Sequence, residues 1–149
     1  MLKTISSVIL AYLVMFAVVF VGLTAAYLAM GADGAFEPGV YDVTTLWLGV
    51  MFVVSLGAAI AGGKVCVFIA KNSKAVFGLA GLVLILGLLS AVPALTASGG
   101  EVKPRTRDVP NLEAMMKAKQ PAWVALLLPV IGVAGVLAGG RMKPGKPAA

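Results

Sequence analysis

The chain has 149 residues, of which 60% are hydrophobic and only 12% are charged, and its mean hydropathy is +1.02. Soluble domains carry about 25% charged residues, so this composition excludes an ordinary soluble globular domain. The net charge of +6 is not gathered into basic runs interleaved with aromatic residues, the pattern of a nucleic-acid surface. We therefore expect no nucleic-acid partner, and the single cysteine, Cys66, excludes an intrachain disulfide.

Four windows of the chain contain neither a charged residue nor a histidine: 4–32, 43–63, 75–100 and 120–140. Each window is long enough to cross a hydrocarbon core, which takes about 20 apolar residues in a helix. They predict transmembrane helices at about 5–30, 44–70, 75–96 and 122–140, in one domain that covers 1–149. The expected fold class is all-α: a polytopic integral membrane protein whose four transmembrane helices form two antiparallel hairpins.

In chain order, the run from Ile5 to Met30 exceeds the roughly 7 to 15 apolar residues of a signal peptide, so we expect a true first span. An acidic loop over 31–42 follows, in which glycines and Pro38 favour turns. The second helix is expected to continue beyond Lys64, because the long side chain of Lys64 can extend to the membrane interface. Only 71–74 separates it from the third helix, which predicts a tight antiparallel pair.

The segment 98–120 is the longest polar stretch and is predicted to be an extramembrane loop. Asn111 is a good helix N-cap, and Glu113 follows in the first turn, where the helix dipole favours an acid. These signals favour a short helix over 111–119 that lies in the membrane interface, with one apolar face formed by Leu112, Met115 and Met116. The alternative is an ordinary capped turn before the fourth helix, after which 141–149 forms a basic tail.

The charge distribution predicts an orientation. If both termini and the turn at 71–74 share one side, that side holds only basic residues, namely Lys3, Lys64, Lys71, Lys74, Arg141, Lys143 and Lys146. All six acidic residues then fall on the other side. The positive-inside rule therefore places both termini in the cytoplasm. We expect a bacterial cytoplasmic membrane, with anionic lipid near these basic residues.

A repeated pattern marks the ends of two helices. Trp47 precedes a Gly-Gly step and Lys64, and Trp123 precedes a second Gly-Gly step and Arg141. Each pair spans about one bilayer thickness along a helix, so these four residues are predicted interface anchors. The pattern indicates either a duplicated two-helix unit or independent use of the same anchoring residues.

Small residues recur at three- and four-residue steps in three of the predicted helices. Such stripes let two helix backbones approach closely inside a membrane. Either these stripes pack the helices of this chain against one another, or at least one stripe faces a partner subunit. The predicted helix-packing residues are Ser55, Gly57, Ala59, Ala61, Gly63, Gly87, Ala91, Gly132, Gly135 and Gly139.

Function has to be inferred largely from what is missing. The sequence has no histidine, and no charged residue lies in the middle of a predicted span. Transport and catalysis inside a membrane usually depend on such residues, so we expect no enzyme activity, no catalytic residues, no cofactor and no bound metal. The sequence favours a non-catalytic accessory or scaffolding subunit that binds other integral-membrane subunits. The alternative is a small transporter or channel that acts as a homo-oligomer.

Overall fold

The structure of the chain is a computed structural model that describes residues 2–96, 104 and 109–142. Five helices cover most of these residues: α1 (Leu2–Ala35), α2 (Thr45–Ala70), α3 (Ser73–Thr96), α4 (Asn111–Lys117) and α5 (Ala122–Arg141). Within the described ranges β pairing is limited to two isolated bridges. The all-α class is therefore confirmed. The predicted basic tail beyond Met142 and most of the first half of the 98–120 loop lie outside the described residues.

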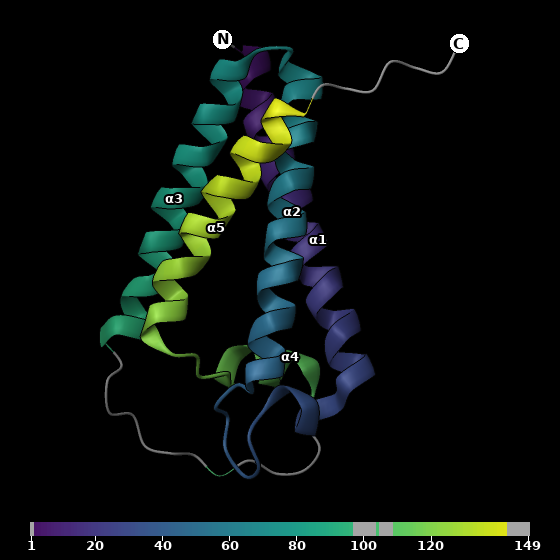
Figure 1. Cartoon of the computed structure of the whole chain (residues 1–149), viewed down its shortest axis with the longest axis vertical. Helices are drawn as coiled ribbons and strands as arrows, with labels where there is room; N and C mark the ends of the chain where they lie inside the picture. Colours follow the sequence, from purple (N-terminus) through teal and green to yellow (C-terminus); the bar gives the residue numbers. More distant parts are fainter. Residues whose placement is uncertain (1, 97–103, 105–108, 143–149) are drawn as a thin grey trace.

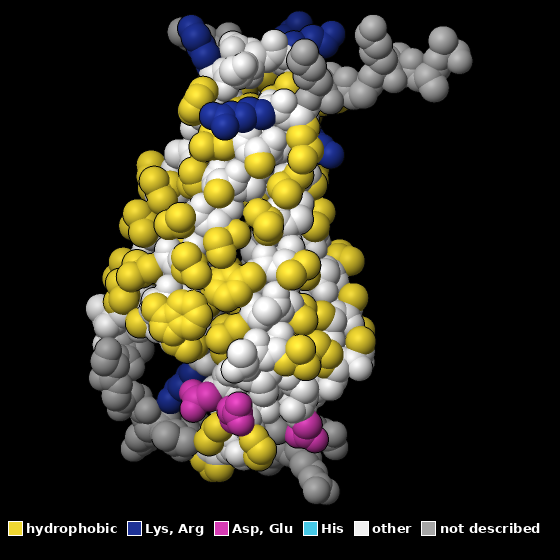
Figure 2. All heavy atoms as spheres, in the orientation of Figure 1, with side chains coloured by type: hydrophobic (Ala, Val, Ile, Leu, Met, Phe, Trp, Pro, Cys, Tyr) yellow, Lys and Arg dark blue, Asp and Glu magenta, His cyan; other side chains and the backbone are white. Residues whose placement is uncertain are grey.

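Four of the helices, α1, α2, α3 and α5, are long and apolar enough to cross a membrane. Figure 2 shows a broad hydrophobic belt between one end with Lys and Arg side chains and another end that carries the acidic ones. Because apolar side chains on the outside of this belt would be costly in water, the protein is an integral membrane protein. The observed helices agree with the predicted ones to within a few residues at either end.

The helix ends follow from local sequence. Gly31 takes a positive φ of 71°, which ends the regular part of α1 where the sequence predicted it. The Thr44 side chain caps α2 by accepting a hydrogen bond from the backbone N–H of Trp47 at 3.2 Å. The same hydroxyl donates to the carbonyl oxygen of Gly34 at 2.7 Å, which ties α2 to the end of α1. At its other end, α2 stops at Lys71, whose backbone is left-handed.

The two predicted pairs, α1 with α2 and α3 with α5, both pack extensively, but α2 also packs against α5, so two separate hairpins are not confirmed. Helix α5 lies between α2 and α3 (Figure 1) and packs extensively against both, while α1 packs chiefly against α2. Helices α2 and α3 meet near the short turn that joins them and then diverge, so the predicted tight pair is not what the structure shows. The reason is that α5 fills the space between them. Helices α2 and α5 run in the same direction, from the end that carries α4 towards the other.

Two buried clusters hold the bundle together. One lies towards the start of α1 and the end of α5, with Ala11, Cys66, Leu79 and Val136 fully buried. The other lies at the α4 end and is aromatic, built from Tyr27, Phe36, Tyr41 and Trp47 together with Val109 and Ala114. We call this second cluster, with α4 and the loop between α1 and α2, the cap.

Candidate functional site

A close backbone contact joins α2 and α5 through small residues. A methyl group added at Gly63 would overlap the backbone of Val136, and one added at Gly139 would overlap the backbone of Ile60. The two contacts are reciprocal: when Trp47 is aligned with Trp123, Gly63 corresponds to Gly139 and Ile60 to Val136. The two copies of the repeated pattern thus pack against each other, as two parallel helices related by a local twofold axis would.

The other predicted packing residues divide into two groups. Gly135 meets Ala59, Gly132 meets Val83, and Gly87 meets Pro129, with a side chain 2.6 to 2.8 Å from where a β-carbon would stand. Ala91 is buried as well. By contrast, the structure leaves Gly57 exposed with open space around it, and Ser55 and Ala61 are half-buried. Most of the predicted stripe therefore packs helices of this chain together.

The predicted interface anchors differ from one another. Trp123 is 55% exposed near the start of α5, and Lys64 and Arg141 are exposed near the opposite ends of α2 and α5. Trp47 is only 8% exposed, and its ring packs edge-on against that of Tyr27, with 6.1 Å between centroids. Its indole thus lies inside the cap and does not face the bilayer. The sequence placed Trp47 at the correct helix end, but the aromatic side chains that cover it come from distant residues.

Side-chain hydrogen bonds fix α4 onto the bundle. The Tyr27 hydroxyl donates to the carbonyl oxygen of Val109 at 2.7 Å, and the Asn111 amide donates to the Thr24 hydroxyl at 3.1 Å. The backbone of Lys119 pairs with the loop before α2, because its N–H donates to the carbonyl of Tyr41 at 2.9 Å. Both ends of the short helix are thereby tied to α1 and to the loop.

A charged pair lies on the outer side of the cap. Lys117 and Glu113 form an ion pair one turn apart in α4, and the Tyr41 hydroxyl donates to the Glu113 carboxylate at 3.4 Å. The hydrogen bond from Lys117 lowers the pKa of Glu113 and, in turn, raises the pKa of Lys117. The ammonium group also lies 5.5 Å from the centre of the Tyr41 ring, a cation–π contact.

The predicted helix over 111–119 is present in part, as α4. The expected cap is wrong: Pro110 takes the N-cap position without a side-chain hydrogen bond, because the Asn111 amide bonds to Thr24 instead. Ala114 on this helix is only 2% exposed, because it packs against the aromatic residues of the cap. Three other apolar side chains of α4 are exposed, at 68% for Leu112, 44% for Met115 and 80% for Met116. We call these three residues the α4 face. They share one side of the helix, as the sequence predicted.

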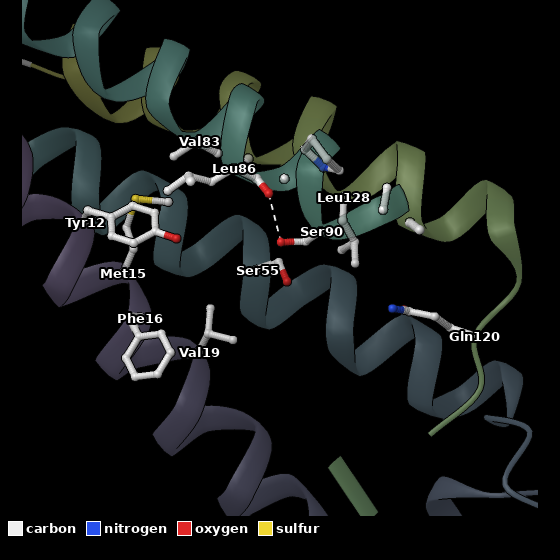
Figure 3. Close-up of a pocket in the computed structure, with 15 residues that line it drawn as sticks. Tyr12, Met15, Phe16, Val19, Ser55, Val83, Leu86, Ser90, Gln120 and Leu128 are labelled. Atoms are coloured by element: carbon white, nitrogen blue, oxygen red, sulfur yellow. Dashed lines mark hydrogen bonds between the residues drawn. The ribbon is translucent and has the colours of Figure 1, made fainter. Parts of the chain in front are cut away.

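A groove opens where α1 and α3 diverge, with α2 and α5 at its base (Figure 3). This lateral groove has a volume of about 320 Å³. Its lining is mostly apolar, and the polar side chains within it are Tyr12, Ser55, Ser90 and Gln120. Ser90 donates to the carbonyl oxygen of Leu86 at 2.8 Å, which satisfies its hydroxyl within its own helix.

Gln120 stands at the α4 end of the lateral groove. In Figure 3 its amide nitrogen points towards the groove. Its Oε1 atom is buried and has no hydrogen-bond partner among the described residues. Gln120 also lines a smaller cavity of about 160 Å³ beneath α4, next to Trp47 and Met115. Sequence reasoning did not single out this residue, although a glutamine directly before a proline and an apolar window is a signal for a polar group at a span boundary.

Within the described ranges, the structure gathers no three His, Cys, Asp or Glu side chains that could hold a metal ion. No protein-family model, no characterised protein and no solved structure matches this chain. The functional inference therefore depends on the cap, the α4 face and the lateral groove.

Proposed function

We propose that the chain is a non-catalytic accessory or scaffolding subunit of a larger integral-membrane complex. The observation that carries this proposal is the α4 face. Its apolar side chains project from a helix that is fixed to the bundle on its other side by the Tyr27 and Asn111 hydrogen bonds. Exposed apolar residues on an ordered surface are typical of protein interfaces, in which methionine is enriched.

The α4 face differs from the other exposed apolar surface of the molecule. The belt around α1, α2, α3 and α5 needs no partner beyond lipid, since it belongs to segments that can span a membrane. The α4 face belongs to a short helix that is not itself a candidate span, and it lies beside the charged pair of Glu113 and Lys117. An apolar patch with a charged rim suits the extramembrane part of another membrane subunit, because the charges select the partner and the apolar side chains supply the contact area.

The proposal includes an orientation. Both termini would lie in the cytoplasm of a bacterial cell, with Lys3, Lys71 and Lys74 near anionic lipid and the cap outside. Asp33→Cys tests this, because Asp33 is exposed at the cap end. A membrane-impermeant thiol reagent should label this variant in intact cells, while buried Cys66 gives the background. Labelling only after the membrane is broken would reverse the orientation.

The complex itself is tested by purification in mild detergent. The full chain should elute as a species much larger than 15.2 kDa plus its detergent and contain other polypeptides. The double variant Leu112→Glu and Met116→Glu should lose these polypeptides and keep its thermal stability, because both side chains are exposed. Met142→Glu is the matched control, since it adds a charge at an exposed methionine at the opposite end.

Two results would overturn the proposal. One is a parent chain that purifies as a single species without other polypeptides. The other is a homo-oligomer that carries a solute across liposome membranes, which would support a transporter or channel instead.

A further inference from the structure

The lateral groove has the location expected of a lipid site. It is bounded by α1 and α3, which are both candidate membrane spans, and Phe16 at its edge is 64% exposed. An opening between two spanning helices faces the hydrocarbon, so the molecules that reach it are those dissolved in the bilayer. Its volume of about 320 Å³ lies within the range of small-molecule sites, roughly 300 to 1,000 Å³.

The apolar lining of the groove suits a lipid chain. A single hydrocarbon chain is much narrower than a helix and can follow the apolar lining formed by residues such as Met15, Val83 and Leu128.

The polar end of the groove indicates what the chain is attached to. Gln120 stands just before α5, at the boundary of a candidate span. Its amide nitrogen points towards the groove (Figure 3). The amide N–H groups are hydrogen-bond donors, so a ligand group bound there has to be an acceptor, such as an ester carbonyl oxygen.

We propose that the lateral groove binds one acyl chain of a glycerophospholipid, whose ester carbonyl oxygen accepts a hydrogen bond from the side-chain amide of Gln120. The arrangement is amphiphilic in the same sense as the lipid: a donor at the boundary of the span and an apolar channel beyond it. The Ser90 hydroxyl does not compete for the ester oxygen, since it already donates a hydrogen bond to the carbonyl oxygen of Leu86.

The test uses the full chain in mild detergent and a synthetic phosphatidylethanolamine with two oleoyl chains, with bound lipid counted by native mass spectrometry. The parent should retain one lipid per chain. Ser90→Phe should lower lipid affinity at least tenfold, because the ring fills the groove. Leu89→Phe is the matched control: it places the same ring on the neighbouring residue, which is exposed outside the groove, and should leave binding unchanged.

The hydrogen bond is tested with a second lipid that carries ether linkages in place of the esters. The parent should bind this lipid roughly fivefold more weakly, the usual effect of one lost hydrogen bond. Gln120→Leu should bind the ester lipid with the same weakened affinity and should no longer distinguish the two lipids. This comparison stands even if Ser90→Phe fails to fold.

Three results would overturn the proposal. In the first, the parent retains no lipid. In the second, Ser90→Phe and Leu89→Phe bind lipid equally. In the third, the groove variants change which polypeptides co-purify and leave lipid binding unaltered, which would assign the groove to a protein partner.

Discussion

The α2–α5 crossing and the cap are held together by different forces. At the crossing, Gly63 and Gly139 allow two backbones to touch, and the contact consists of van der Waals packing without side-chain hydrogen bonds. In the cap, aromatic rings pack edge-on and hydroxyl and amide groups donate to oxygens on other segments. Inside a membrane, packing has to supply the attraction between helices, because lipid tails are as apolar as the side chains. In the cap, hydrogen bonds and aromatic packing together supply the attraction between segments.

This difference predicts that the crossing is sensitive to added volume and that the cap is sensitive to lost hydrogen bonds. Gly139→Leu should have the largest effect. Its side chain would overlap the backbone of Ile60, which cannot move aside as a side chain can, so we expect a loss of about 3 kcal/mol or more in the free energy of unfolding. Thermal unfolding in detergent measures it.

Leu127→Ile is the control for that variant, because Leu127 is 38% exposed on the same helix and the change keeps side-chain volume. Its stability should stay close to that of the parent. Equal stability of Gly139→Leu and the parent would show that α2 and α5 do not meet at this residue.

Tyr27→Phe should have an intermediate effect confined to the cap. The variant leaves the buried carbonyl of Val109 without the hydroxyl that donates to it at 2.7 Å, and such a loss costs about 1 to 2 kcal/mol. Hydrogen exchange at the backbone amides of Ala114 and Ala118 should accelerate, while amides along α5 keep their protection. Uniform acceleration in both regions would mean that cap and crossing unfold as one unit.

Acidification should give a smaller effect, again in the cap. Because the pKa of Glu113 is lowered in the folded state, its pair with Lys117 contributes stability above the ordinary glutamate pKa of about 4.3 and loses it as the pH falls through the lowered value. The pKa of Lys117 is raised, so the same contribution is also lost above the ordinary lysine pKa of about 10.4. The loss of stability at acid pH is measured by amide exchange within α4, followed from neutral to acid pH.

Glu113→Gln should remove this pH dependence. An unchanged pH dependence in that variant would assign the titration to another carboxyl group.

Gly57→Leu should have the smallest effect, within about 0.5 kcal/mol of the parent. Gly57 belongs to the same stripe as Gly63, but no atom from another helix lies within 4 Å of where its β-carbon would stand. Comparing the stabilities of Gly57→Leu and Gly63→Leu therefore shows whether a residue matters because it belongs to the stripe or because it contacts another helix. A large loss in Gly57→Leu would indicate that this face meets something other than lipid.

Several features could be predicted from the sequence because they depend on local composition and period. The four charge-free windows became four helices, Gly31 interrupted the first of them, and Glu113 lies in the first turn of α4, where an acid was expected. These outcomes require only that apolar runs form helices in lipid, that glycine adopts a positive φ, and that the helix dipole favours an acid in the first turn.

The partners of these elements could not be predicted in the same way. Nothing near Trp47 in the sequence indicates that Tyr27 covers its ring, or that Tyr27 also reaches Val109 across most of the chain. The small-residue stripes indicated that close packing would occur, without saying that α5 would lie between α2 and α3. Only the tertiary arrangement decided which glycines are in contact and which face lipid.

The sequence by itself determined that this chain spans a membrane, how many helices do so and roughly where each begins, because transfer of apolar residues into lipid depends on composition and length. The tertiary structure alone decided the order of the helices in the bundle, the burial of Trp47 and the position of Gln120 at the end of a groove. The physical reason is that helix association in lipid has no strong hydrophobic drive. It therefore depends on shape complementarity between surfaces far apart in the chain, which no local pattern encodes.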